Sequence, residues 1–219
     1  METFGDLFKT IVEQNQQPEE KKEEKWKKVL PRIEEEFKKR NLDIQYEPIS
    51  IPMVLAKCMT HESIGNRGVL LTGCTGCGKT ERIKILADLG YVRMVNAYDL
   101  AYEVANVKDT DSKRNLYNYP EYMNHSPRQY DLIIDDLGAE NEAYNVYGNR
   151  GDTMALILQE RYIAWKRFGA MTCATTNLSV AELKKRYTER EFSRLADMFT
   201  VVTLLGDDRR IENNKSFQF

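Results

Sequence analysis

Residues 73–80 of the 219-residue chain read Gly73-Cys74-Thr75-Gly76-Cys77-Gly78-Lys79-Thr80. This stretch fits the pattern G-x-x-x-x-G-K-[ST], the phosphate-binding loop of nucleoside triphosphatases. A short apolar run at residues 68–72 precedes it and predicts a buried strand, and residues 81–89 carry apolar side chains on one helical face. Strand, glycine-rich loop and helix therefore follow one another in the order that phosphate binding requires.

The residue types of this loop predict a site for ATP and Mg²⁺. Its glycines let successive backbone N–H groups converge on phosphate oxygens, and the helix N-terminus adds a partial positive charge. We expect Lys79 to reach the β- and γ-phosphates and the Thr80 hydroxyl to ligate Mg²⁺. The alternative is a chance glycine-rich turn, which the flanking strand and helix disfavour.

Two pairs of residues raise the question of a zinc site. Cys74 and Cys77 form C-x-x-C, and Cys58 and His61 form C-x-x-H. The first pair lies wholly inside the phosphate loop, where zinc would compete with the nucleotide for the backbone. A reversible redox lock on the loop is a second alternative. We favour the interpretation that these cysteines are inert small residues.

The composition indicates a soluble globular protein with room for one α/β domain and an appendage. Hydrophobic residues make up 42% of the chain and charged residues 30%. No apolar run approaches the ~20 residues that span a bilayer, and the N-terminus lacks the features of a signal peptide, so we expect a cytoplasmic protein. The net charge of −2 and the absence of a long basic block do not predict strong non-specific binding to duplex DNA.

Strands alternate with helices along the rest of the chain. We expect further strands at residues 91–95, 131–138, 170–175 and 201–205. Helices are expected at residues 53–59, 97–107 and 153–168, and from 179 through 187 or beyond. Residues 140–152 are expected to form a polar loop. This order predicts a doubly wound, mainly parallel five-stranded sheet that binds its ligand at the carboxyl ends of the strands.

The N-terminal part differs from this pattern because it is rich in Lys and Glu. Residues 4–12 have the apolar spacing of an amphipathic helix, and residues 19–39 carry a thin apolar stripe, in which Pro31 predicts a kink or two helices. We divide the chain into a charged helical N-terminal arm (1–40), a linker (41–52) and an ATPase domain (53–219). The arm is interpreted as a solvated helix on the main domain, or as a docking arm for another protein.

Polar side chains at the ends of two predicted strands complete a catalytic set. The apolar run Leu132-Ile133-Ile134 ends in Asp135 and Asp136, close to where Mg²⁺ and the γ-phosphate are expected. Asp135 is the candidate for holding Mg²⁺ through water, and Asp136 for orienting and deprotonating the attacking water. Asn177 follows the next strand and is a candidate for positioning that water.

Three arginines, Arg186, Arg190 and Arg194, recur at intervals of four and are expected on one helical face. Such a stripe is commonly a solvated or ion-paired face. It also suits an arginine finger, which brings positive charge to the transferring phosphoryl group from another subunit.

Four of these segments together resemble AAA+ ATPases of the DnaC/DnaI helicase-loader group, whose clade includes the IstB transposition ATPases. They are residues 73–80, Asp-Asp-Leu-Gly-Ala-Glu at 135–140, Ala-Thr-Thr-Asn-Leu at 174–178 and Arg-Glu-Phe-Ser-Arg-Leu at 190–195. The resemblance covers roughly residues 53 to 211. It implies Asn177 as sensor 1, Arg194 as the arginine finger and Arg210 as a nucleotide contact. Asp136 stands where AAA+ proteins more often have Glu.

The resemblance also implies a function, and the sequence departs from the family in two respects. We expect an ATP-dependent DNA replication factor, a helicase loader that forms a homo-oligomer, hydrolyses ATP between subunits, and engages a replicative DNA helicase through its arm. The alternatives are an IstB-like transposition ATPase and a nucleotide-gated binding module with little hydrolysis. No C-terminal helical lid and no cysteine-rich zinc domain are expected.

Single-stranded DNA is the second expected partner of such a loader. Tyrosines and basic residues gather between the second and third predicted strands, where aromatic rings and positive charge suit stacking on single-stranded DNA. The alternative is that several of these tyrosines pack in the core. The residues concerned are Tyr98, Tyr102, Lys108, Lys113, Arg114, Tyr117, Tyr119 and Tyr122.

Overall fold

The computed structural model describes residues 24–42, 50–90, 92–117, 127–140, 144–146 and 149–205. The helix predicted at residues 4–12 lies outside these segments. In the described part of the chain, no helix combines the length and the apolar character needed to cross a bilayer.

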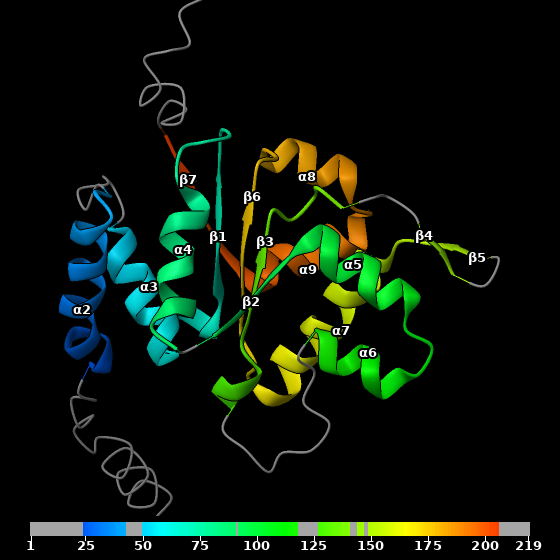
Figure 1. Cartoon of the computed structure of the whole chain (residues 1–219), viewed down its shortest axis with the longest axis horizontal. Helices are drawn as coiled ribbons and strands as arrows, with labels where there is room; N and C mark the ends of the chain where they lie inside the picture. The colour runs from blue at the N-terminus through cyan, green and yellow to red at the C-terminus, as the bar shows by residue number, and fades with distance from the viewer. Residues whose placement is uncertain are drawn as a thin grey trace, which may run out of the picture.

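Five of the described strands form one sheet in the order β2-β3-β6-β1-β7, and every pairing in it is parallel. A parallel sheet needs crossover helices, and these cover both of its faces (Figure 1). The doubly wound architecture predicted from the sequence is therefore confirmed. The strands are β1 (Gly68–Gly73), β2 (Arg93–Asn96), β3 (Leu132–Asp135), β6 (Thr172–Thr176) and β7 (Phe199–Leu204).

The two helical layers each close one hydrophobic core against the sheet. Because side chains alternate across a strand, Ile133 faces one core, whereas Leu132 and Ile134 face the other. The first layer contains α2 (Lys25–Lys39), α3 (Ile51–Thr60) and α4 (Lys79–Asp88). The second contains α5 (Ala97–Asn106), α6 (Thr110–Leu116), α7 (Thr153–Phe168), α8 (Val180–Arg186) and α9 (Glu189–Met198).

The centre of the sheet is packed so closely that one position accepts glycine alone. A Cβ atom on Gly68, at the start of β1, would lie 1.6 Å from the carbonyl oxygen of Thr172 on β6. Any larger residue would push β1 away from β6, and with it the loop that follows β1.

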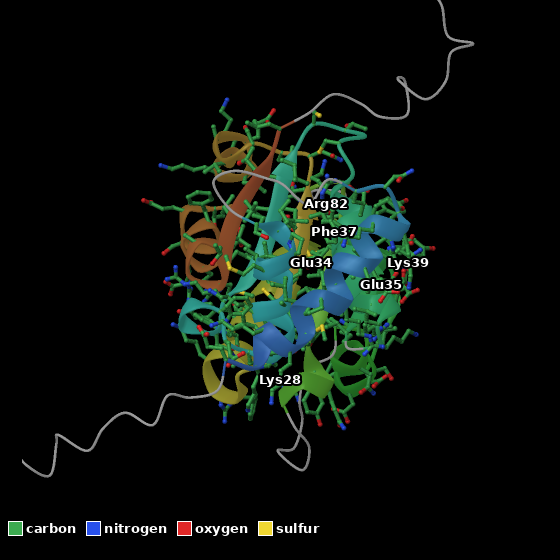
Figure 2. All side chains as sticks on the ribbon, turned by 90° about the vertical axis from the view of Figure 1, so that its left-hand side faces the viewer. Lys28, Glu34, Glu35, Phe37, Lys39 and Arg82 are labelled. Atoms are coloured by element: carbon green, nitrogen blue, oxygen red, sulfur yellow. The ribbon has the colours of Figure 1, made fainter. Side chains whose placement is uncertain are left out.

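Helix α2 corrects the prediction of two helices that meet at Pro31. The helix runs unbroken from Lys25 to Lys39 with Pro31 inside it, and Pro31 itself is exposed. Ile33 and Phe37 are fully buried against α3 and α4, and this burial offsets the hydrogen bond that a proline removes. Figure 2 shows α2 lying across the α3–α4 layer, with Phe37 beneath it.

Two further boundaries differ from the predicted ones. Helix α3 begins at Ile51, so residues 51 and 52, expected at the end of a linker, are helical and buried. The polar loop expected at residues 140–152 contains an antiparallel hairpin of β4 (Tyr144–Val146) and β5 (Asn149–Gly151). The first difference follows from burial of Ile51 and Pro52, and the second from strand pairing that a polar composition does not reveal.

The three arginines predicted to share one helical face do not do so, because the segment that carries them forms two helices. Helix α8 ends at Arg186, and Tyr187 is extended. Thr188 then caps α9, and its side chain and that of Glu191 form a capping box. Arg186 and Arg194 therefore lie on different helices. The pattern Thr-x-x-Glu at residues 188–191 is the sequence signal that predicts this break.

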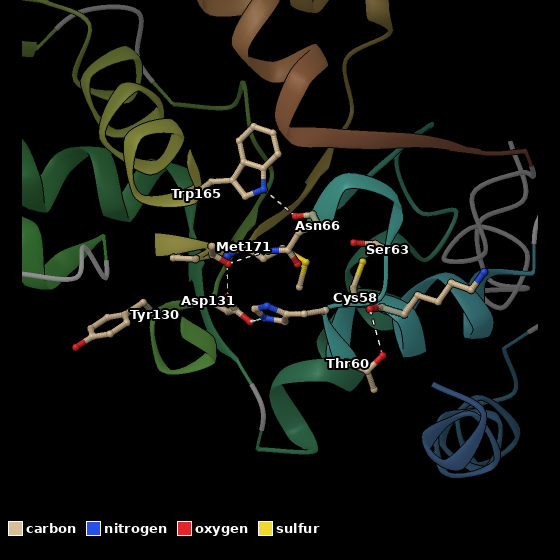
Figure 3. A network of polar contacts seen from close by, with 12 residues as sticks. Cys58, Thr60, Ser63, Asn66, Tyr130, Asp131, Trp165 and Met171 are labelled. Atoms are coloured by element: carbon tan, nitrogen blue, oxygen red, sulfur yellow. Dashed lines mark hydrogen bonds and ion pairs between the residues drawn. The ribbon is translucent and has the colours of Figure 1, made fainter. Parts of the chain in front are cut away.

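A buried polar network joins the elements at the opposite end of the sheet from the phosphate loop. The Asp131 carboxylate lies 2.6 Å from Nε2 of His61 and accepts a hydrogen bond from the Met171 N–H at 2.7 Å (Figure 3). Arg161, fully buried on α7, donates to the carbonyls of Tyr130 and Met171. Burial lowers the pKa of Arg161 to about 10. These groups connect α3, α7, β3 and β6, and thereby hold the strands in register.

Candidate nucleotide-binding site

The glycine-rich loop connects β1 to α4 at the carboxyl edge of the sheet, as the sequence predicts. Gly76 and Gly78 have φ angles of 78° and 86°, in the left-handed region that favours glycine. A Cβ on Gly78 would also lie 2.6 Å from Nη1 of the buried Arg82. Gly78 is the N-cap of α4, and no side chain caps that end, which leaves the first turn of the helix suited to an anion.

Lys79 joins the loop to the end of a neighbouring strand. Its ammonium donates hydrogen bonds to the carbonyl oxygens of Gly73, at 2.9 Å, and Cys74, at 2.7 Å. It donates a third, also of 2.7 Å, to Oδ1 of Asn177. The tertiary structure thus brings together Lys79 and Asn177, which are 98 residues apart in the sequence.

The expected Mg²⁺ ligands are neighbours. The Thr80 hydroxyl donates to Oδ1 of Asp135 at 3.0 Å. Magnesium prefers oxygen ligands, takes one or two of them from carboxylates and keeps several waters, so Thr80 and Asp135 fit this ion. Among the described residues, no three His, Cys, Asp or Glu side chains gather where they alone could hold a metal ion.

The sequence reasoning missed the particular role of Thr175, which positions both acids. Its fully buried hydroxyl donates to Oδ1 of Asp135 at 2.6 Å and accepts from the N–H of Asp136 at 2.9 Å. Asp136 has a φ angle of 56°, a left-handed conformation that costs a non-glycine residue about 1–2 kcal/mol. Thr175 helps to hold this strained residue, and Nδ2 of Asn177 lies 3.3 Å from its Oδ1.

Most of the predicted site residues line one cavity of about 520 Å³. Its lining includes Lys79, Thr80, Asp135, Asp136 and Asn177. A mononucleotide fits a cavity of this size.

One wall of the cavity comes from the residues directly after α2, which the sequence analysis assigned to the end of the arm (1–40) and the start of the linker (41–52). Arg40, Asn41 and Leu42 line it. Arg40 forms an ion pair with Asp88 of α4 at 2.8 Å and donates to the Glu81 carbonyl at 3.3 Å. The i, i+4 spacing of Ile33 and Phe37 is the signal that indicates docking of α2 against the domain.

Arg186 serves as a buried ion-pair partner. It bonds to Glu140 at 2.8 Å and to Asp152 at 2.6 Å, and Glu140 also accepts from the Tyr187 hydroxyl and the Gly138 N–H. Burial lowers the pKa of Arg186, but Asp152 and Glu140 outweigh it and raise that pKa above its usual value. This network anchors α8 to the turn that follows Asp136.

The remaining predicted residues lie away from the cavity or outside the described segments. Arg194, on α9, donates to Oε1 of Gln159 at 3.2 Å, stacks on the Tyr162 ring at 5.5 Å, and is not among the cavity's lining residues. Tyr98 and Tyr102 are exposed on α5, whereas Tyr117 is buried. Outside the described residues lie Tyr119, Tyr122 and Arg210.

Comparison with known proteins supports the fold. A DnaI crystal structure is similar over 78% of this chain and 89% of its own, with 20% identity and a TM-score of 0.55. AMPPCP-bound DnaA from Aquifex aeolicus is similar with 17% identity and a TM-score of 0.55. A structure of the replication initiator DnaA bound to AMPPCP and single-stranded DNA has 16% identity and a TM-score of 0.52.

The chain has the fold of these proteins. The match to Aquifex DnaA spans 81% of this chain and about half, 54%, of the longer DnaA chain. No protein-family model matches the sequence, and no curated protein sequence matches it. The predicted fold class, a doubly wound parallel five-stranded sheet, is confirmed, and the fold is shared with the DnaI and DnaA structures.

The role of Thr175 is testable through stability. Thr175→Val keeps the shape of the side chain but leaves the Asp136 N–H without its acceptor, which costs about 1–3 kcal/mol. We expect the free energy of unfolding, measured by urea denaturation, to fall by about that amount. Thr200→Val, at a partly exposed position of β7, is the matched control and should change it by less than about 0.5 kcal/mol. Equal effects of the two substitutions would contradict the role of Thr175.

Proposed function

We propose that the chain binds and hydrolyses ATP with Mg²⁺ as a DNA replication factor of the helicase-loader type. The observation that carries the proposal is the convergence of Lys79, Thr80, Asp135, Asp136 and Asn177 on one cavity. Lys79 and Thr80 begin α4, Asp135 ends β3, and Asp136 and Asn177 directly follow β3 and β6. An accidental glycine-rich turn does not account for this arrangement.

Each side chain has a distinct task in this proposal. The loop N–H groups and Lys79 bind the β- and γ-phosphates. To do so, Lys79 gives up its hydrogen bonds to the Gly73 and Cys74 carbonyls and donates to phosphate oxygens instead. Thr80 and Asp135 hold Mg²⁺, which supplies positive charge to the phosphate oxygens when bound. Asp136 accepts a proton from the attacking water, and Asn177, which contacts both Lys79 and Asp136, orients that water.

The proposed site is completed by a second copy of the chain. Arg194 lies outside the cavity of its own chain, so as an arginine finger it must act on the nucleotide of a neighbour. Its contacts with Gln159 and Tyr162 hold it against α7. We therefore propose a homo-oligomer with ATP between subunits. Arg210 stays a predicted nucleotide contact.

The partners are proposed from the resemblance and from the surface of α5. Tyr98 and Tyr102, 46% and 53% exposed, are one helical turn apart and present two rings on which bases of single-stranded DNA can stack. A similar fold binds single-stranded DNA in the DnaA structure named above. The charged N-terminal arm is the proposed contact for a replicative helicase, and we place this activity in the cytoplasm.

Substitutions in the cavity test the ATPase assignment. Lys79→Ala should weaken ATP binding by about tenfold or more, because it removes a charged contact to phosphate. Asp136→Asn should keep ATP binding but lower the hydrolysis rate by about a hundredfold. Lys84→Ala, an exposed lysine on the same helix, is the matched control for both measurements. Undiminished hydrolysis in Asp136→Asn would contradict the mechanism, and ATP binding without hydrolysis in the wild type would favour a nucleotide-gated binding module.

Mixing two inactive variants tests whether Arg194 acts between subunits. Arg194→Ala should bind ATP but lose hydrolysis, as should Asp136→Asn. In a mixture, some interfaces combine an intact Asp136 with an intact Arg194, so part of the hydrolysis rate should return. Mixing Arg194→Ala with Lys84→Ala provides the reference for dilution of active subunits. An oligomer in which the first mixture stays inactive would contradict action between subunits.

Affinity capture with the full chain separates a helicase loader from an IstB-like transposition ATPase. Retention of a hexameric replicative helicase, lost when residues 1–23, which precede α2, are deleted, supports the first. Retention of a transposase in its place would show that the second is correct.

A further inference from the structure

The phosphate loop carries two cysteines whose surroundings differ. Cys74 is exposed, whereas Cys77 is 3% exposed and its Sγ lies 3.8 Å from Nζ of Lys79. A Cβ on Gly73 would lie 3.2 Å from the same sulfur, so Cys77 packs against the inside of the loop. One thiol is therefore accessible to a reagent, and the other lies beside the lysine that binds phosphate.

The loop geometry places these two residues within reach of each other. Thr75 and Gly76 form a turn between them. The ends of such a four-residue turn have Cα atoms less than about 7 Å apart, and disulfides join Cα atoms that are about 4.4–6.8 Å apart. Burial raises the pKa of the Cys77 thiol and so does its hydrogen bond with Cys74, while the charge of Lys79 lowers it. The turn therefore allows a disulfide between the two residues.

We propose that Cys74 and Cys77 form a reversible dithiol–disulfide switch, oxidised by hydroperoxides, that turns off nucleotide binding at the phosphate loop. The inference rests on the proposed function, because the switch acts on ATP binding. It also replaces our interpretation of these cysteines as inert small residues.

The oxidation needs two steps. The Cys74 thiol gives up its proton, and its thiolate attacks a hydroperoxide oxygen, so that an S–O bond forms as the O–O bond breaks. From hydrogen peroxide the products are a sulfenic acid and hydroxide, which takes up the released proton and becomes the first water. The Cys77 sulfur then attacks Sγ of Cys74, the S–S bond forms, and the S–O bond breaks as hydroxide takes the Cys77 proton and leaves as a second water. The two sulfurs lose two electrons, and the hydroperoxide gains them. A dithiol reductant reverses the reaction by thiol–disulfide exchange.

The disulfide would act through the backbone that binds phosphate. It would close a small ring across residues 74–77 and hold the turn in one conformation. Lys79 donates to the carbonyls of Gly73 and Cys74 in this conformation, which keeps its ammonium inside the loop. Phosphate binding requires Lys79 to leave these carbonyls and the loop N–H groups to converge on the anion. A constrained loop resists both changes.

The other two cysteines provide an internal control. Cys58, whose Sγ lies 3.9 Å from the Arg67 carbonyl before β1, and Cys173, near the start of β6, are both buried, at the opposite end of the strands from the loop. A Cys58→Ala/Cys173→Ala variant retains the proposed switch, whereas Cys74→Ala and Cys77→Ala each remove one half of it. For each variant, ATP binding is compared before and after oxidation. Any effect of the substitution itself on ATP affinity then cancels.

The full chain, first reduced, is treated with hydrogen peroxide and measured by intact mass, peptide mapping and ATP binding. We expect a loss of about two mass units, located at Cys74–Cys77, and about tenfold or greater weakening of ATP binding, reversed by dithiothreitol. ATP added before the peroxide should slow disulfide formation. The Cys58→Ala/Cys173→Ala variant should respond like the wild type, and Cys74→Ala and Cys77→Ala should form no bond within the loop.

Two results would overturn the switch while leaving the proposed function intact. They are the absence of a Cys74–Cys77 disulfide in a chain that binds ATP when reduced, and a disulfide that leaves ATP binding unchanged. Failure of the reduced chain to bind ATP would refute the proposed function and the regulatory role together. Mass and reduced-state binding therefore distinguish the two failures.

Discussion

The candidate site depends on the parallel pairing of β6 between β1 and β3. Ala174 of β6 pairs with Leu70 on one side and with Ile134 on the other. Parallel strands in this register end at the same level, so the phosphate loop, the two acids and Asn177 emerge together. The same register lets Thr175, one residue further along β6, reach Asp135 and Asp136. Buried apolar side chains on both faces of the sheet maintain this alignment.

The two helical layers contribute to the site in different ways. Helices α3 and α4 pack on the face of the sheet from which α4 continues the phosphate loop. Helix α2 adds to this layer, and Arg40 to Leu42 at its end form one wall of the cavity. Arg40 joins that wall to α4 through Asp88. A partner that moved the N-terminal region would therefore act directly on the cavity. This is a physical route between the proposed arm and the nucleotide.

In the opposite layer, Arg186 and Arg194, which the sequence predicts on one helical face, lie on different helices. Arg186 is buried and satisfies Glu140 and Asp152, so its charge stabilises the turn after Asp136. Arg194 lies one helix later, partly exposed against α7. Removing Arg186 would leave two carboxylates without their shared cation, one of them buried, whereas removing Arg194 would leave neutral partners. Their roles differ because of their partners and their burial.

The sequence by itself determined the class of the fold, and it predicted a phosphate loop and Lys79, Thr80, Asp135, Asp136 and Asn177 as site residues, which the structure brings to one cavity. These follow from local patterns, since loop glycines, apolar strands and terminal acids are recognisable within a few residues. The unbroken α2, its place in the cavity wall, the division between α8 and α9, and the task of Thr175 were decided by the tertiary structure. Each depends on contacts between residues far apart in the chain: burial of Phe37 outweighs Pro31, and Thr175 meets the acids only when β6 pairs with β3. The thiols of Cys74 and Cys77 acquire different exposure in the same way, because the folded loop turns one outward and packs the other beside Lys79.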